Sequence, residues 1–243
     1  MAGTLTGANL ISRIQDILQD TTSIRWPEAE LLRYINDAQR EVCNLRPEST
    51  AATANTALVV GTKQSLPSGG LRLIRVVRNM SSAAANATGA RAVRLVDVDI
   101  LNTQEPDWHN PTVSGDAAHT TTVKHYIFDE DNPRSFYVYP GASSTSTFLE
   151  LVYSAAPANL GSTSATIAVD DIFANALIDY TLFRCYLKDA EFAGNEARAG
   201  THYQLFVGSL TGGGQAQFGL SPNQDRTSGM VIPPGVGPQQ ALG

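Results

Sequence analysis

Two pairs of carboxylates are the residues of this sequence whose type and spacing come closest to acid–base chemistry. Asp170 and Asp171 are adjacent, and Asp97 and Asp99 stand two residues apart. A hydrolase of glycosidic bonds needs two carboxyl groups across a cleft, one as acid and the other as base or nucleophile. Asp170 and Asp171 also stand where a helix is predicted to begin, and there a carboxylate stabilises the free N–H groups of the first turn. This capping role explains both residues, so we expect no catalytic residue among them.

The histidines and cysteines lack the spacing of a metal site. No two of the four histidines share a predicted helix at ligand spacing, and the cysteines form no C-x-x-C motif. The acidic run at residues 129–131 lacks the alternating oxygen ligands and distal glutamate of a calcium loop, so a solvated hairpin tip is expected. Glycine-rich phosphate-binding motifs at a helix start are also absent. The sequence therefore predicts no metal and no cofactor.

Cys43 and Cys185 are the two cysteines, and both fall in helical patterns. A thiol in such a position usually behaves as a small hydrophobic core residue, so buried free thiols are expected. A disulfide between the two stays possible, but a single pair in a chain of 243 residues says little about the compartment.

Arg72, Arg75 and Arg78 recur at every third position of a predicted strand. Because the side chains of a regular strand alternate between its two faces, these arginines are expected on both faces and not in one basic stripe. Arg91 and Arg94 follow nearby, without the interleaved aromatic residues of a nucleic-acid groove. Salt bridges within the chain or between subunits are the favoured role.

The composition is that of a globular, weakly charged protein. Of 243 residues, 42% are hydrophobic and 16% are charged, and the net charge is −6, which disfavours a general affinity for nucleic acid. The N-terminus lacks the basic region and apolar run of a secretory signal, and no apolar stretch has the length of a membrane span. We therefore expect a soluble protein that is made in the cytoplasm.

Helix pairs are predicted at both ends of the chain. In residues 170–210, apolar residues recur at spacings of three and four, and Gly194-Asn195 interrupts the pattern where a helix can close. An antiparallel pair that ends at the glycines 212–214 is expected. The N-terminal pair comprises a helix near residues 8–19 and a second one that opens at Trp26-Pro27, where proline suits the first helical position.

Residues 48–169 are predicted to form five to seven mostly antiparallel strands. The clearest hairpin joins residues 123–128 to 135–139, residues 91–111 are expected to be extended or irregular, and a last short strand is expected at 166–169. The predicted fold is therefore α+β. Antiparallel helix pairs from residues 5–47 and 170–210 form a helical bundle, the β-rich module of residues 48–169 is inserted between them, and residues 211–243 form an extended C-terminal arm.

The arm is dominated by glycine and proline, so nothing in it buries a regular apolar face. Spaced apolar residues in this polar background could order on a partner surface and fill its pockets. The predicted partner-binding residues are Phe218, Leu220, Met230, Val231 and Ile232.

Several collinear segments resemble a known family. The pattern W-P-x-x-E-L-L-R-Y-I-N-D-A-Q-R-E at residues 26–41 resembles the adaptor proteins of short-tailed bacteriophages, which are head-to-tail connectors related to the tail tubular protein A family. The likeness spans about residues 10–210 in the same order, and the C-terminal arm is its least matched part. The further matching segments are residues 71–79, 105–109, 125–127, 136–140, 153–157, 187–191, 194–195 and 202–203.

The resemblance implies a structural protein of the virion and not an enzyme. Such adaptors form a ring, commonly dodecameric, between the portal protein and the tail nozzle or tail tube protein, and DNA passes through the channel without sequence-specific binding. The C-terminal extension can reach along the portal, which would give the arm residues a partner. The location implied is the neck and tail of the virion, after assembly in the host cytoplasm and without a membrane.

Two alternative functions stay open at this stage. One is a virion-associated cell-wall hydrolase that uses a carboxylate pair. The other is a carbohydrate- or receptor-binding tail module, whose aromatic platform would consist of Trp108, Tyr126, Tyr137 and Tyr139. Alternation along the predicted hairpin favours core packing for at least half of these aromatic residues.

Overall fold

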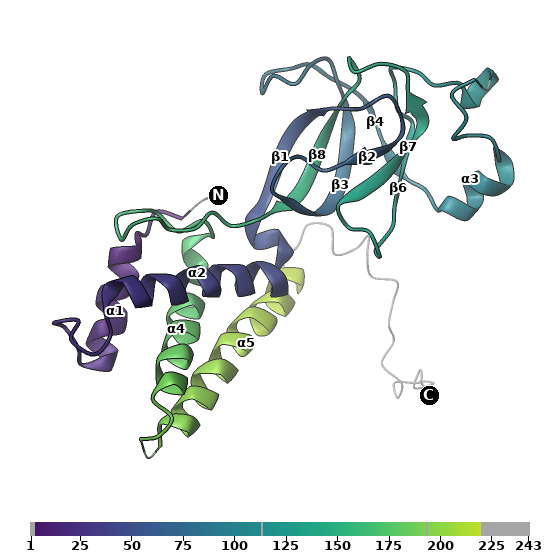
Figure 1. Ribbon diagram of the computed structural model, residues 1–243. Helices are drawn as coiled ribbons and strands as arrows, with labels where there is room; N and C mark the ends of the chain where they lie inside the picture. Colours follow the sequence, from purple (N-terminus) through teal and green to yellow (C-terminus); the bar gives the residue numbers. More distant parts are fainter. Residues whose placement is uncertain (1–2, 113, 193, 220–243) are drawn as a thin grey trace, which may run out of the picture.

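The computed structural model describes residues 3–112, 114–192 and 194–219. The long helices gather in a bundle at one end of the molecule, and the strands form a β module at the other (Figure 1). The chain enters the module after the second helix and returns before the last two, so both terminal regions build the bundle. The predicted α+β fold with an inserted, mostly antiparallel β-rich module is confirmed.

The long helices of the bundle are α1 (Gly7–Leu18), α2 (Glu28–Leu45), α4 (Ala174–Lys188) and α5 (Asn195–Gly219). Thr6 caps α1 through a capping box with Asn9. Pro27 is the N-cap of α2, so this helix begins one residue later than expected. In Figure 1, α2 lies across α1 and α4, while α5 returns along α4.

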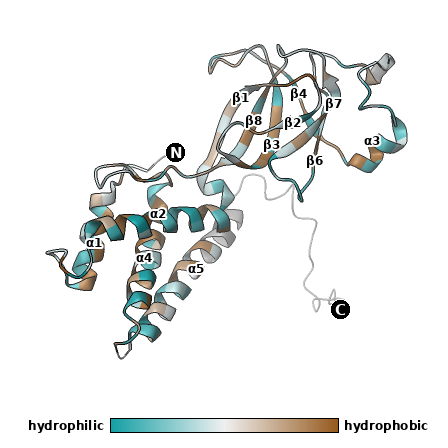
Figure 2. Ribbon diagram, viewed as in Figure 1, coloured by the Kyte–Doolittle hydropathy of each residue, from teal (hydrophilic) through white to brown (hydrophobic). Residues whose placement is uncertain are grey.

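One continuous apolar core holds the four helices together. Its fully buried members come from every long helix and include Ile14, Leu31, Leu177 and Phe206. Hydrophobic and hydrophilic stretches alternate along these helices in Figure 2, as expected where one face of each helix is buried. Apolar side chains from the N-terminal and the C-terminal helix pair are therefore buried against each other, although the two pairs are far apart in sequence.

The C-terminal helix is longer than the glycine pattern predicts. Residues 212–214 do not end it, because α5 continues to Gly219 and so includes the first residues of the predicted arm. Glycine in a helix costs about 1 kcal/mol relative to alanine, and this weakens a helix without breaking its hydrogen bonds.

The strands are β1 (Ala51–Ala57), β2 (Gly61–Ser65), β3 (Gly70–Met80), β4 (Gly89–Ala92), β5 (Arg94–Leu95), β6 (His125–Phe128), β7 (Ser135–Ala142) and β8 (Phe148–Ala155). They form two four-stranded sheets in the orders β1-β8-β3-β4 and β2-β7-β6-β5. All pairings are antiparallel except that of β5 with β6. The strand expected at residues 166–169 is reduced to a single bridge between Thr166 and Thr6.

The β module has two apolar cores. The larger one lies between the sheets and contains Leu73, Val76, Phe136 and Leu151. The smaller one lies on the outer side of the second sheet, where Leu101 and Trp108 pack against β6 and β7. Leu101 belongs to helix α3 (Val98–Gln104), in a region that was expected to be extended or irregular. A helix of seven residues is too short to show a helical repeat of apolar residues in the sequence, so α3 could not be predicted from periodicity.

Candidate interaction surfaces

The carboxylate pair at Asp170 and Asp171 has a structural role. Asp170 caps the short helical turn η3 (Asp171–Phe173) by accepting a hydrogen bond from the N–H of Ile172. Asp171 accepts hydrogen bonds from the hydroxyl and N–H of Thr4 and from the N–H of Leu5. The hydrogen bond from the Thr4 hydroxyl, helped by the Leu5 amide, holds the pKa of Asp171 below its usual range. Asp171 thus ties the N-terminal segment to the start of the last helix pair.

The second carboxylate pair also belongs to a helix start. Asp97 is the N-cap of α3 and accepts a hydrogen bond from the N–H of Asp99, 2.9 Å away. Asp99 lies in the first turn, where a negative charge is favourable. Both residues are exposed on the outside of the module, and they do not face one another across a cleft.

The histidines do not gather into a metal centre. Among the described residues, no group of three or more potential ligands could hold a metal ion. His109 shares a hydrogen bond of 2.8 Å with the hydroxyl of Thr62, and His202 contacts Asp179 at 2.9 Å in the bundle.

The four aromatic residues considered for sugar binding do not form one platform. Trp108 and Tyr139 are buried in the smaller core, and Trp108 donates a hydrogen bond to Asn102. Tyr126 points to the opposite side of its sheet, into the larger core. Neighbouring residues of a strand face opposite sides of the sheet. Tyr126 therefore packs in the larger core, whereas Tyr137 and Tyr139 of β7 pack in the smaller one. This overturns the idea of a shared aromatic surface.

Both cysteines are free and buried, which confirms the favoured prediction and rules out the disulfide between them. Cys185 lies in the bundle core, where burial raises the pKa of its thiol to about 12. Cys43 lies at the junction with the module, within 3.1 Å of the Thr50 hydroxyl.

The arginines of β3 correct a sequence-based prediction. The register of β3 against β8 shifts between Leu73 and Arg75 and again between Val76 and Arg78. Each shift inserts one extra residue, so a spacing of three in β3 matches a spacing of two in β8. The arginines 72, 75 and 78 therefore lie opposite residues 154, 152 and 150, all on one face of the sheet. They share the outer face, because the alternating positions 73 and 76 point into the larger core.

We call the outer face around Arg72 and Arg75 the arginine face. Arg78 is paired there with Glu150 at 2.6 Å. Arg72 and Arg75 are exposed, and neither forms an ion pair with a carboxylate of the described residues. Arg91 and Arg94 are likewise exposed and unpaired in the part of the chain that the structure describes.

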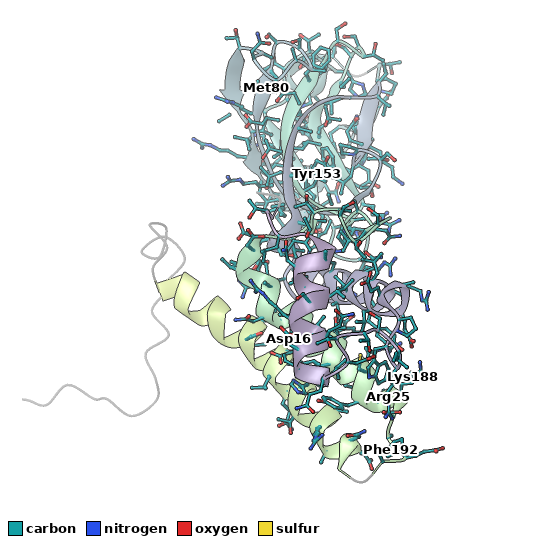
Figure 3. The ribbon with its side chains drawn as sticks, turned by 90° about the vertical axis from the view of Figure 1, so that its left-hand side faces the viewer. Asp16, Arg25, Met80, Tyr153, Lys188 and Phe192 are labelled. Atoms are coloured by element: carbon teal, nitrogen blue, oxygen red, sulfur yellow. The ribbon has the colours of Figure 1, made fainter. Side chains whose placement is uncertain are left out.

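The free end of the bundle presents a second surface. Arg25, in the turn between α1 and α2, pairs with Asp189 and lies 4.8 Å from the ring centre of Phe192. Lys188 pairs with Glu30 at 2.7 Å. In Figure 3, Arg25, Lys188 and Phe192 gather at this end, whereas Met80 lies at the far end of the β module. Apolar side chains are exposed nearby, with Ile17 at 49%, Ile24 at 84% and Phe192 at 58%.

Four of the five predicted arm residues lie outside the residues that the structure describes, namely Leu220, Met230, Val231 and Ile232. The fifth, Phe218, belongs to the last turn of α5.

The comparisons place this architecture in a family. The sequence matches the SU10 adaptor protein family over residues 5–232, a range that includes the bundle, the β module and much of the arm. No curated protein matches the chain. No helix among the described residues is both long and apolar enough to cross a membrane. The match agrees with the resemblance to head-to-tail connectors, and the chain belongs to the SU10 adaptor proteins, a family of phage adaptors.

Proposed function

We propose that this protein is a structural head-to-tail adaptor of the virion, which forms a ring between portal and tail and lines part of the DNA channel. The observation that carries the proposal is the family match over residues 5–232, which includes both halves of the fold. A match of this extent links the function to the whole architecture and not to one local site. We accordingly propose no catalytic activity for the chain.

The arrangement of the molecule supports a connecting role. The bundle end with Phe192 and the distal end of the module with Met80 are at opposite ends of the molecule in Figure 3. Exposed apolar residues lie beside ion pairs at the bundle end, and such surfaces are typical of protein contacts. A subunit with contact surfaces at its two ends can bridge one ring of proteins above it and another below it.

The partners that we propose are further copies of the chain, the portal protein, and a tail nozzle or tail tube protein. The C-terminal arm would contact the portal through Phe218, Leu220, Met230, Val231 and Ile232. The protein would assemble in the host cytoplasm and remain in the neck of the virion, without a membrane. A net charge of −6 suits a channel through which DNA passes without being held, because few cations are available for its phosphates.

A co-sedimentation assay with the purified portal ring tests this proposal. The full chain should sediment with the ring, and removal of residues 220–243 should weaken binding at least about tenfold if the arm supplies a major part of the contact. The variant V231D/I232D should behave like the truncated chain. The matched control V236D/L242D places the same charges in the arm at residues outside the predicted set and should bind like the unaltered chain. If the full chain does not sediment with the portal ring, the proposed function is overturned.

A further inference from the structure

The arginine face carries two guanidinium groups that form no ion pair within the described residues. The two shifts of register in β3 place Arg72 and Arg75 side by side on the exposed face of the first sheet. The third arginine, Arg78, is already paired with Glu150, so its charge is satisfied. Ile74 lies between the two unpaired arginines in sequence and is 41% exposed. The face therefore combines two free guanidinium groups with apolar area.

A surface with the complementary properties lies around helix α3, and we call it the α3 corner. Its acidic residues are Asp97, Asp99, Glu105 and Asp107. None of them is in an ion pair within the described part of the chain. Two apolar side chains are exposed between these charges, Val98 at 40% and Ile100 at 50%. The α3 corner thus offers carboxylates, which the arginine face lacks, together with exposed apolar area.

The two surfaces are attached to different sheets of the β module. Residues of both sheets meet in the larger core, and the arginine face is the outer side of the first sheet. The smaller core, with Leu101 and Trp108, attaches the α3 corner to the outer side of the second sheet. In Figure 1, α3 stands out from the β module on the side away from β1. The two surfaces consist of different residues, so one chain presents both of them to its neighbours.

Two different surfaces of one subunit that complement each other can form a head-to-tail contact. Such a contact repeats from copy to copy, and it closes into a ring when the rotation between copies divides a full turn. We propose that the α3 corner of one copy docks on the arginine face of the next copy in the ring. This inference rests on the proposed function, because it assigns the contact between neighbouring subunits of the adaptor ring. Charge complementarity would select the correct register and orientation of neighbours.

A second copy fits the arginine face better than DNA does. The chain carries a net charge of −6, and the arginine face has only two unpaired cations, few for holding a polyanion against salt. A second copy brings carboxylates together with exposed apolar side chains, which match Ile74 as well as the arginines. The experiment below therefore includes DNA binding by the arginine face as a result that would overturn the proposal.

Charge reversal on each surface tests the proposal with the full chain. The variant R72E/R75E makes the arginine face negative, and D99K/D107K places two lysines on the α3 corner and so cancels its net charge while leaving the cap residue Asp97 in place. Assembly is followed by native mass, with the chain alone and with the portal ring. Each variant alone should require at least about tenfold more protein for half assembly than the unaltered chain, because like charges face each other in R72E/R75E and the attraction between the two surfaces is lost in D99K/D107K.

An equimolar mixture of the two variants should recover assembly. In the mixture, the glutamates of one altered face meet the lysines of the altered corner at one contact, and the native pair of charges meets at the next, so rings with alternating subunits form. The matched controls are R13E/R33E and D16K/E28K, which change the net charge equally at exposed positions of the bundle and should assemble normally. Thermal unfolding of each monomer confirms that the variants are folded.

The possible failures are distinguishable. If the unaltered chain never forms a ring, even with the portal, the proposed function fails and this contact with it. If the unaltered chain forms a ring and R72E/R75E assembles equally well, only the contact assigned here is overturned. Loss of double-stranded DNA retention by R72E/R75E with unchanged assembly would assign the arginine face to DNA and would also overturn the proposal. Recovery in the mixture alone supports it.

Discussion

The bundle pairs more of its basic residues with carboxylates than the β module does, although Arg13 and Arg33 of the bundle also form no ion pair within the described residues. In the bundle, Arg25, Arg40 and Lys188 each pair with a carboxylate, and Arg184 lies over the ring of Tyr34. In the module, the Arg78–Glu150 pair contrasts with the unpaired arginines 72, 75, 91 and 94.

This difference separates the two roles of the fold. The bundle uses its charges to fix its own helices, since its ion pairs join the turn after α1 and the start of α2 to the end of α4. The module leaves exposed arginines outside ion pairs within the described residues, so these side chains are available to another molecule. We therefore regard the bundle core as the part that holds the subunit together, and the outer faces of the module as the part that recognises neighbouring copies.

The largest expected effect is the loss of a bundle core residue. Phe206 is fully buried between α4 and α5, and its ring centre lies 5.1 Å from that of Tyr180. The substitution Phe206→Ala should lower the free energy of unfolding by about 3–5 kcal/mol, because it removes apolar contacts and leaves a cavity. Chemical unfolding measures this change. The neighbouring exposed residue provides the control, and Leu205→Ala should change stability by no more than about 0.5 kcal/mol. Equal effects of the two substitutions would contradict the described packing of α5.

Acid should weaken the module before the bundle. Burial, followed by the charges of Arg91 and Arg94, holds the pKa of His125 below its ordinary value of 6.5. His125 therefore binds a proton more readily in the unfolded chain than in the folded one. Its contribution to the free energy of unfolding is complete above pH 6.5 and is lost as the pH falls through the folded pKa. In the bundle, the hydrogen bond from Lys188 holds the pKa of Glu30 below 4.5. That stability is complete above pH 4.5 and is lost only in stronger acid.

The two tryptophans allow each region to be followed separately. Trp26 is buried in the bundle core, and Trp108 is buried in the smaller core of the module. The variant Trp108→Phe reports on the bundle, and Trp26→Phe reports on the module. Unfolding followed by fluorescence at several pH values should show the module losing stability between pH 6.5 and 4.5, with a smaller loss in His125→Gln. Parallel losses in both regions, or an unchanged response in His125→Gln, would refute this ordering.

The smallest expected effect concerns the paired arginine of the module. The Arg78 side chain is 47% exposed, so its pair with Glu150 is screened by solvent. The substitution Glu150→Gln should cost at most about 1 kcal/mol of folding stability. It should also leave ring assembly intact, since the proposed contact uses Arg72 and Arg75. A loss of assembly in Glu150→Gln would indicate that the subunit contact includes the Arg78–Glu150 pair.

Local patterns in the sequence predicted the helices well. The periodic apolar residues and the caps of α1 and α2 place these helices within about two residues of their observed bounds, because helix contacts are between near neighbours. The helix expected from Asp170 to Gly194 is shorter, because α4 begins at Ala174 after the turn η3 and ends at Lys188. The end of α5 was placed too early because the glycines 212–214 were taken as a stop signal, although glycine only weakens a helix. The capping role of Asp170 was also predicted correctly from its position.

The surfaces of the module depend on pairings that the sequence does not display. The arginines of β3 were expected to alternate between faces, and two shifts of register against β8 place them on one face instead. Such shifts depend on the partner strand, so no pattern within β3 reveals them. Similarly, the division of Tyr126 and Tyr139 between two cores follows from the sheet arrangement. The sequence thus indicated the fold class, but the arginine face had to be found from the strand register.

The most direct test of the adaptor function is the native mass of the purified portal ring before and after addition of the full chain. The mass should rise by a fixed whole number of 25.9 kDa subunits, the same in every particle, as expected of a closed ring on a defined platform. A portal ring whose mass stays unchanged, or one that binds a variable number of chains, would contradict the adaptor function.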